Sequence, residues 1–315
     1  MMKFNEIMRK SIFLFFALMA VASLRVVAQS MQTYQFAEKD GQALLMDVYT
    51  PAEVNDNTVT ILYIFGGGFI GGERNDTLGL PFCNHLAEAG FNAVAIDYRL
   101  GLKGVKNLSV TNYQPLENAI NMAVEDAIDA LAYLISHADT LRVNTEKIVL
   151  VGCSAGAITA LHTDHALCNG LLNSDILPAD FRLAGVASFA GAILTTEGKI
   201  SYRNHAPAPT MFFHGTADKL VPYDQIVFFK LGFYGSSKLV KRFAKFGYPY
   251  YFCPFEGLGH SVAAFFNYTI DQLQWFVKRY VEEKQPWQVE QTFKGMDRFM
   301  HFDYDEYSLD YLYGK

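Results

Sequence analysis

The segment Gly152–Gly156, with the sequence GCSAG, constrains the fold of this chain more than any other. It follows Lys147–Val151, a short apolar run rich in β-branched residues, which predicts a buried parallel strand. It precedes Ala157–His162, whose residues can continue as a helix. A serine flanked by glycines between a strand and a helix predicts a nucleophile elbow, which holds the Ser154 hydroxyl clear of the backbone at a helix N-terminus. A glycine-rich turn with an incidental serine is the alternative.

The rest of the chain alternates apolar runs with helical patterns. Hydrophobic residues make up 51% of the 315 residues, so a large core can form in one α/β domain or two smaller ones. The alternation predicts a mostly parallel, doubly wound sheet of roughly eight strands with helices on both faces. We expect strands at Thr33–Ala37, Ala43–Tyr49, Thr58–Ile64, Phe91–Asp97, Lys147–Val151, Leu183–Phe189, Thr210–Phe213 and Tyr250–Pro254. We expect further helices at Pro81–Glu88, Leu116–His137, Tyr223–Lys230, Lys238–Phe246 and His260–Glu283.

The N-terminus has the pattern of a secretory signal peptide. Basic residues precede the apolar run Ile12–Leu24, and small residues up to Ala28 offer a cleavage site before Gln29. The run is shorter than the roughly 20 residues of a membrane span, although an uncleaved anchor is the alternative. We therefore expect residues 1–28 to be a signal peptide, the protein to be secreted to the periplasm or beyond the cell, and no stable membrane insertion after cleavage.

The remaining chain divides into a catalytic domain, residues 29–284, and an aromatic-rich C-terminal extension, residues 285–315. Pro286 ends the last predicted helix. The extension then carries aromatic side chains at Phe293, Phe299, Phe302, Tyr304, Tyr307, Tyr311 and Tyr313. It either packs on the domain or forms a surface for a partner or a second copy, because aromatic residues are enriched at interfaces. A homo-oligomer is therefore left open.

A serine hydroxyl needs a base and an orienting acid before it becomes a nucleophile. Where an elbow carries the nucleophile, the chain order is serine, then acid, then histidine. Asp218 follows the predicted strand Thr210–Phe213, and His260 follows the predicted strand Tyr250–Pro254. Both therefore lie past the C-terminal ends of strands, as Ser154 does. We predict a triad of Ser154, His260 and Asp218.

Other polar residues have weaker claims. His214 is expected to be structural, and Asp175 and Asp224 are rival acids, the latter placed inside the next predicted helix. His162, Asp164 and His165 lie close enough on one helix to suggest weak metal ligands, but no further ligand has suitable spacing, so we expect neither a metal nor a cofactor. The net charge is −6 and no Lys or Arg cluster stands out along the sequence, so nucleic acid is not an expected partner.

The four cysteines are too few and too scattered for a disulfide framework. Cys153, inside the elbow, is expected to point away from the site as a small apolar residue. One bridge among Cys83, Cys168 and Cys253 is left open.

Three consecutive glycines, Gly66–Gly68, follow the predicted strand that ends at Ile64. Without side chains, such a loop can bend and aim backbone N–H groups at the oxyanion of a tetrahedral intermediate. We predict the oxyanion donors to be Gly67 and Gly68, together with Ala155 after the nucleophile. A flexible turn is the alternative.

Together these features resemble the α/β-hydrolases, and most closely the carboxylesterases and hormone-sensitive-lipase-like esterases, among them secreted esterases that deacylate plant polysaccharides. The resemblance covers residues 35–283 and rests on Gly66–Gly68, Asp97–Leu100, Glu125–Asp126, the Ser154 elbow, Asp218 and His260. The family often has a histidine before the glycines, where this chain has Phe65. That difference leaves the hydrogen bonding of the loop and the subfamily open.

The resemblance implies a secreted serine esterase that acts on short acyl esters or on acetyl and feruloyl groups of polysaccharides. The expected partner is therefore a small-molecule or carbohydrate ester. Two alternatives are a serine peptidase of the same fold, because the same triad cleaves amides, and a binding protein that has kept the fold without the chemistry.

Overall fold

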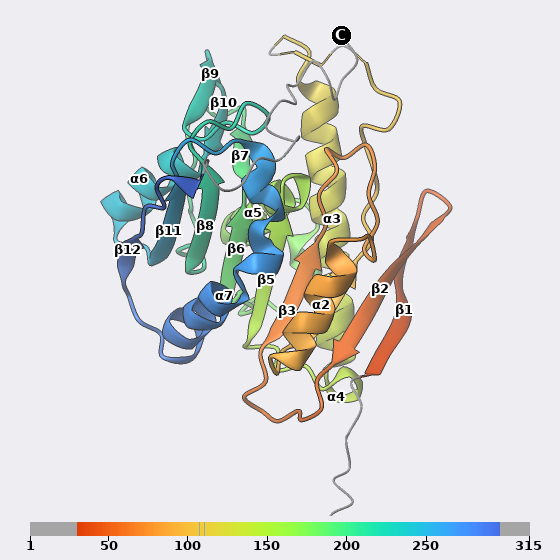
Figure 1. The fold of residues 1–315 in the computed structure, drawn as a ribbon. Coiled ribbons are helices and arrows are strands. Elements are labelled where there is room, and N and C mark those ends of the chain that lie inside the picture. Colours follow the sequence, from red (N-terminus) through yellow and green to blue (C-terminus); the bar gives the residue numbers. More distant parts are fainter. Residues whose placement is uncertain (1–29, 107, 110, 297–315) are drawn as a thin grey trace, which may run out of the picture.

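The computed structural model describes residues 30–296 except residues 107 and 110 (Figure 1). The predicted signal peptide and residues 297–315 of the C-terminal extension lie outside the described residues. Within the described ranges, no helix is long and apolar enough to cross a membrane.

A nine-stranded sheet forms the centre of the fold, with the strand order β1-β2-β4-β3-β5-β6-β8-β11-β12. β2 pairs antiparallel with β1 and β4, and every later pair in that order is parallel. The bounds are β1 Ser30–Lys39, β2 Gln42–Thr50, β3 Thr60–Ile64, β4 Asn92–Ile96, β5 Ile148–Cys153, β6 Gly185–Phe189, β8 Thr210–Gly215, β11 Tyr250–Phe255 and β12 Gln288–Glu290. All eight predicted strands are present, and β12 adds a ninth.

Helices cover both faces of this sheet (Figure 1). α2 (Gly79–Glu88) and α7 (Ile270–Phe276) lie on one face, while α3 (Gln114–Ser136), α5 (Ala155–Asn169) and α6 (Ser236–Phe246) lie on the other. Every residue of β3, β4, β5, β6, β8 and β11 is consequently buried. Burial on both faces explains why these strands are continuous apolar runs instead of alternating patterns.

One predicted helix was wrong, and another is divided into three segments. Residues 223–230 form no helix: Gln225–Phe228 is strand β9, paired with β10 (Leu231–Gly235), which pairs with β7 (Ala192–Thr195) in a small antiparallel sheet. The β-branched and aromatic residues of β9 favour this extended conformation. The last predicted helix is divided into a 3₁₀ segment, His260–Tyr268, then α7, then a π-helical segment, Val277–Glu282.

Thr269 explains the first of these breaks. Its hydroxyl donates to the carbonyl of Phe265 at 3.0 Å, which is the carbonyl that an α-helical N–H at residue 269 would use. The Thr269 N–H turns instead toward the carbonyl of Phe266. A threonine side chain that competes for a helix carbonyl in this way favours a helix boundary.

Buried ion pairs fix the segment that follows β4. Asp126 on α3 is completely buried, and its carboxylate accepts hydrogen bonds from the backbone N–H of Arg99 at 2.7 Å and from Arg99 Nε at 2.9 Å. Burial raises the pKa of Asp126, although the bonds from Arg99 oppose that rise. Glu125 also pairs with Arg99, at 3.2 Å, but its side chain is 37% exposed.

We expect Asp126→Ala to lower the free energy of unfolding by about 3–5 kcal/mol, because it leaves the Arg99 guanidinium without its buried partner. Glu125→Ala is the matched control and should lower it by less than about 1 kcal/mol, since that pair is exposed. Urea unfolding of both variants measures the difference. Equal losses would contradict the assignment of Asp126 as the principal anchor.

Candidate active site

The structure brings the three predicted triad residues together at one edge of the sheet. Ser154 follows β5, Asp218 follows β8 and His260 follows β11, so each lies past the C-terminal end of a parallel strand. His260 Nε2 is 2.8 Å from Ser154 Oγ, and His260 Nδ1 is 2.8 Å from Asp218 Oδ2. These contacts form a continuous hydrogen-bonded chain from a carboxylate through an imidazole to a hydroxyl. Such a chain can withdraw the hydroxyl proton and return it to a leaving group.

Close backbone contacts produce the predicted elbow. Ser154 has φ 52°, a left-handed conformation that is strained for a residue with a side chain. A Cβ atom on Gly152 would overlap the carbonyl of Gly156, and one on Gly156 would overlap the carbonyl of Ile64 at the end of β3. Both glycines are therefore required by packing, which lets α5 begin directly against the sheet with Ser154 at the turn.

The acid of the triad has a second histidine partner. Asp218 Oδ1 accepts hydrogen bonds from the backbone N–H groups of Leu220 and Val221, at 2.8 and 3.0 Å. His214 Nε2 lies 3.2 Å from Asp218 Oδ2, the same oxygen that His260 contacts. Burial opposes ionisation of Asp218, but the bonds from His214 and His260 outweigh it and hold the pKa of this carboxyl well below its usual range. The structure thus favours a permanently charged acid.

His214 was expected to be structural, and its contacts show which parts of the fold it connects. The ring is fully buried, with Nδ1 2.8 Å from Ser236 Oγ at the start of α6. It therefore connects α6 to Asp218. His214 lies in strand β8, where a spacing of four residues to Asp218 does not indicate a contact, so the sequence carried no signal for this pair.

The glycine loop approaches the nucleophile closely. A Cβ atom on Gly66 would lie 3.3 Å from the Cβ atom of Ser154. Gly67 and Gly68 both have positive φ, 114° and 64°, and a side chain on Gly67 would overlap the carbonyl of Gly71. Ala155 is the first residue of α5, and the first N–H groups of a helix have no partner within it. The three predicted oxyanion donors are thus backbone groups of two elements that meet beside Ser154.

An aromatic stack supports the glycine loop at Phe65. Phe65 stacks on Tyr98 with ring centroids 4.3 Å apart and an interplanar angle of 26°. The Tyr98 hydroxyl donates to the carbonyl of Phe65 at 3.0 Å, and both side chains are buried. Phe69 packs against the same Tyr98 ring in a T-shaped arrangement. Tyr98 therefore supplies the hydrogen bond to the loop that the absence of a histidine had left open.

The rival polar residues have other partners. His162 Nε2 accepts the N–H of Leu194 at 2.9 Å, and burial lowers the pKa of His162 to about 3. Asp164 accepts the N–H of Ala208 instead, and no group of three or more potential metal-ligating side chains occurs in the described part of the chain. Asp224 lies in the turn before β9, not in a helix, and contacts Ser237 and Lys241.

All four cysteines lie in the described part of the chain, and each is a buried free thiol. The Cys153 sulfur is 3.5 Å from the Tyr63 hydroxyl, and burial raises the pKa of Cys153 to about 12. A buried thiol with so high a pKa is chemically inert.

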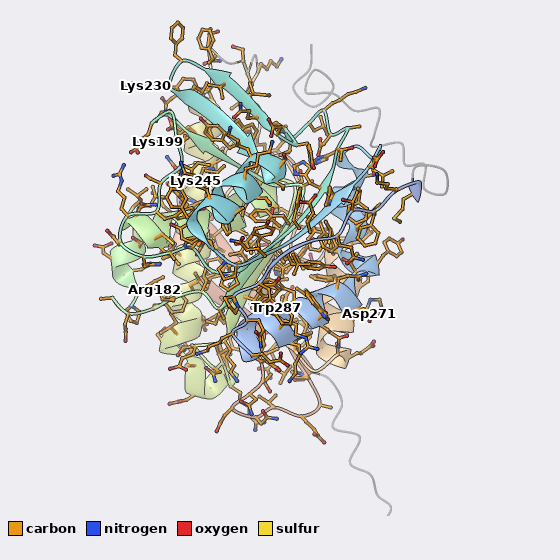
Figure 2. All side chains as sticks on the ribbon, turned by 90° about the vertical axis from the view of Figure 1, so that its left-hand side faces the viewer. Arg182, Lys199, Lys230, Lys245, Asp271 and Trp287 are labelled. Atoms are coloured by element: carbon orange, nitrogen blue, oxygen red, sulfur yellow. The ribbon has the colours of Figure 1, made fainter. Side chains whose placement is uncertain are left out.

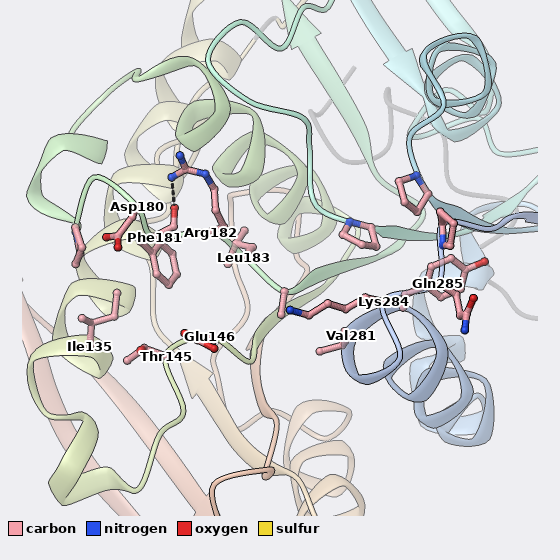
Figure 3. Close-up of a pocket in the computed structure, with 16 residues that line it drawn as sticks. Ile135, Thr145, Glu146, Asp180, Phe181, Arg182, Leu183, Val281, Lys284 and Gln285 are labelled. Atoms are coloured by element: carbon pink, nitrogen blue, oxygen red, sulfur yellow. Dashed lines mark hydrogen bonds between the residues drawn. The ribbon is translucent and has the colours of Figure 1, made fainter.

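A cavity of about 680 Å³ lies at the opposite edge of the sheet (Figure 3). It is lined by residues that precede strands, among them Glu146 before β5, Leu183 before β6 and Pro249 before β11. Arg182 is held there by a hydrogen bond to the carbonyl of Phe181. This cavity is therefore separate from the Ser154 edge.

Comparison with known proteins agrees with this architecture. Residues 46–192, which include the glycine loop and the elbow, match the family model described as BD-FAE. Esterase 2 of Thermogutta terrifontis in its propionate-bound form superposes with a TM-score of 0.57 at 23% identity, over 79% of this chain and 93% of that one. Its apo form gives a TM-score of 0.56 at 24% identity, over 82% and 98%.

The chain has the α/β-hydrolase fold. Two curated proteins match shorter segments of this hydrolase fold. A non-reducing polyketide synthase of Stachybotrys bisbyi is 31% identical over 42% of this chain and 6% of its own length. An ethyl acetate hydrolase of Pseudomonas putida is 28% identical over 39% of this chain and 34% of its own length. The chain thus spans a small part of the curated relatives that it matches.

Tyr98→Phe tests the support of the glycine loop. Loss of the hydroxyl leaves the buried carbonyl of Phe65 without its donor, so we expect the free energy of unfolding to fall by about 1–3 kcal/mol. Tyr34→Phe removes an exposed hydroxyl that bonds Gln32 and should leave stability unchanged. Urea unfolding measures both, and an undiminished stability of Tyr98→Phe would contradict this role.

Asp164 predicts a pH dependence of stability. Burial raises the pKa of Asp164 to about 7, whereas the pKa of an aspartate in the unfolded chain is about 3.9. Between these values the folded state holds a proton that the unfolded state has lost, so this group makes stability fall as pH rises from about 4 to about 7. Asp164→Asn should therefore gain stability relative to wild type over that interval. Urea midpoints at several pH values measure the gain, with exposed Asp139→Asn as the control, and parallel curves for wild type and Asp164→Asn would refute it.

Proposed function

We propose that this chain is a secreted serine carboxylesterase that hydrolyses short-chain acyl esters through a Ser154–His260–Asp218 triad. The observation that carries the proposal is the pair of 2.8 Å contacts that link the three side chains. The esterase neighbours, the BD-FAE match and the relative named ethyl acetate hydrolase support ester hydrolysis.

In the first half of the reaction, Ser154 Oγ attacks the ester carbonyl carbon while His260 Nε2 takes the hydroxyl proton. Asp218, ionised and buried, orients the ring through Nδ1 and stabilises the imidazolium. The N–H groups of Gly67, Gly68 and Ala155 bind the oxyanion. His260 then protonates the departing alkoxide, and the alcohol leaves an acyl group on Ser154.

In the second half, His260 removes a proton from water, which attacks the acyl carbon. Collapse of the second tetrahedral intermediate releases the carboxylic acid and returns the proton to Ser154 Oγ. His214 acts as a positioning residue, because its contact with Asp218 Oδ2 keeps the carboxylate charged and in place throughout.

The similar solved structures support a short acyl group in the substrate. Structures of the Thermogutta terrifontis esterase carry bound propionate and butyrate. Acetyl or feruloyl groups on polysaccharides are the proposed natural esters, since the predicted signal peptide would deliver the enzyme to such substrates outside the cytoplasm.

Turnover of p-nitrophenyl acetate by residues 29–315 tests the function. We expect Ser154→Ala to lower kcat by at least about 10³-fold, because the nucleophile is lost. Ser136→Ala, which changes an exposed serine at the end of α3, should retain wild-type kcat. A fluorophosphonate probe should label wild type at Ser154 and leave Ser154→Ala unlabelled.

A folded wild type no faster than Ser154→Ala, with no labelling, would favour a binding protein of this fold. Faster cleavage of peptide p-nitroanilides than of matched esters would indicate a peptidase instead.

A further inference from the structure

Helix α6 carries its basic residues on one face. They recur at intervals of three and four along the chain, which places them on one side of a helix: Lys238, Lys241, Arg242 and Lys245. The opposite side packs into the core through Leu239, Val240 and Phe243. No basic cluster stands out along the sequence because these apolar residues separate the cations, and the helix brings the cations together.

This basic face lines a cavity of about 410 Å³. Lys199, from the loop after β7, lines the same cavity together with Gln225 of β9 and Tyr234 of β10. The Tyr234 hydroxyl donates to the carbonyl of Gly198 at 2.7 Å and so fixes the loop that presents Lys199. Figure 2 shows Lys199 and Lys245 on the same side of the molecule. Five cations thus surround one concavity, which we call the basic groove.

The protein neutralises little of this charge. Among the residues that the structure describes, one of these five cations pairs with a carboxylate. Lys241 Nζ lies 3.1 Å from Asp224 Oδ1, and both side chains are exposed. In the same described part, Arg242 Nε is buried and has no hydrogen-bond partner. Like charges three and four residues apart destabilise a helix, and Lys238 in the first turn opposes the helix dipole. Arg242 and Lys245 lie over the Phe246 ring, 4.7 and 5.6 Å from its centroid, and Lys245 in the last turn complements the helix dipole, but these contacts leave the positive charge of the face in place.

The N-terminus of α6 lies near the acid of the candidate active site. α6 begins at Ser236, which contacts His214, and His214 contacts Asp218. Because β8 ends and α6 begins at the same edge of the sheet, the first cation, Lys238, lies within one helical turn of that edge. A ligand along α6 would therefore extend away from the Ser154 edge.

We propose that the basic groove binds a carboxylate-bearing polysaccharide, so that the substrate of the esterase is an acyl ester on an acidic polymer. This inference rests on the proposed function for its link to catalysis. The cations of α6 extend over about 10 Å of helix, which suits several charges spaced along a chain better than a single ion. The groove is concave, so a polymer chain can enter it and contact several of its cations at once.

Binding of polygalacturonate to the Ser154→Ala protein tests the groove directly, because the measurement needs no catalysis. We expect Lys238→Glu/Lys245→Glu to weaken binding by at least tenfold in isothermal titration calorimetry. Lys147→Glu/Lys278→Glu changes the net charge equally on other surfaces and should bind as Ser154→Ala does. Lys238→Ala/Lys245→Ala gives a second, milder variant, and thermal unfolding confirms that each protein is folded. Raised salt should weaken binding, since the contacts are ionic.

With Ser154 intact, the same charge reversals should lower kcat/KM at least tenfold on acetylated polygalacturonate. They should leave turnover of acetylated neutral xylan and p-nitrophenyl acetate unchanged. Absence of polygalacturonate binding with normal p-nitrophenyl acetate turnover would overturn the inference and leave the proposed function intact. Loss of p-nitrophenyl acetate turnover in wild type would instead remove the proposed function. Preferential binding to phosphatidylserine vesicles or to duplex DNA would also overturn the inference, in favour of a lipid or nucleic-acid surface.

Discussion

The contact between the start of α5 and the end of β3 is the constraint on which the site depends. Gly156 lies so close to the carbonyl of Ile64 that no side chain fits between them. The chain leaves β3 through Phe65 into the glycine loop, and it enters α5 through Ser154. One backbone contact therefore brings the nucleophile and the loop beside each other. The strained φ of Ser154 is maintained by this packing, which the buried sheet and helices hold on both sides.

Much of this arrangement could be predicted because its signals are local or follow from topology. The strand, glycines and helix around Ser154 lie in one segment, and a parallel sheet gathers Asp218 and His260 at the edge where β8 and β11 end. The hairpin of β9 and β10 was missed because its short run of apolar residues resembles a helix segment when read alone. Its extended form depends on the pairing of β10 with β7, a strand about forty residues earlier that was also missed.

The tertiary contacts around the site could not be predicted from the sequence for a different reason. Tyr98 lies in a segment that the resemblance had marked, but only the fold shows its hydroxyl under the Phe65 carbonyl. His214 had the correct structural assignment without its partner, since nothing in a linear pattern indicates that two histidines share one carboxylate oxygen. Side-chain partners of this kind follow from packing between elements, and the packing depends on every strand being in register.

The aromatic support of the glycine loop makes the shape of the loop independent of pH. An imidazole under such a loop changes its charge near neutrality, and the loop would then respond to acidity. The Tyr98 phenol does not, because burial raises its pKa well above its ordinary value. The hydroxyl that holds the Phe65 carbonyl stays protonated from acid to strongly alkaline solution. The oxyanion loop is thus insulated from changes in proton concentration.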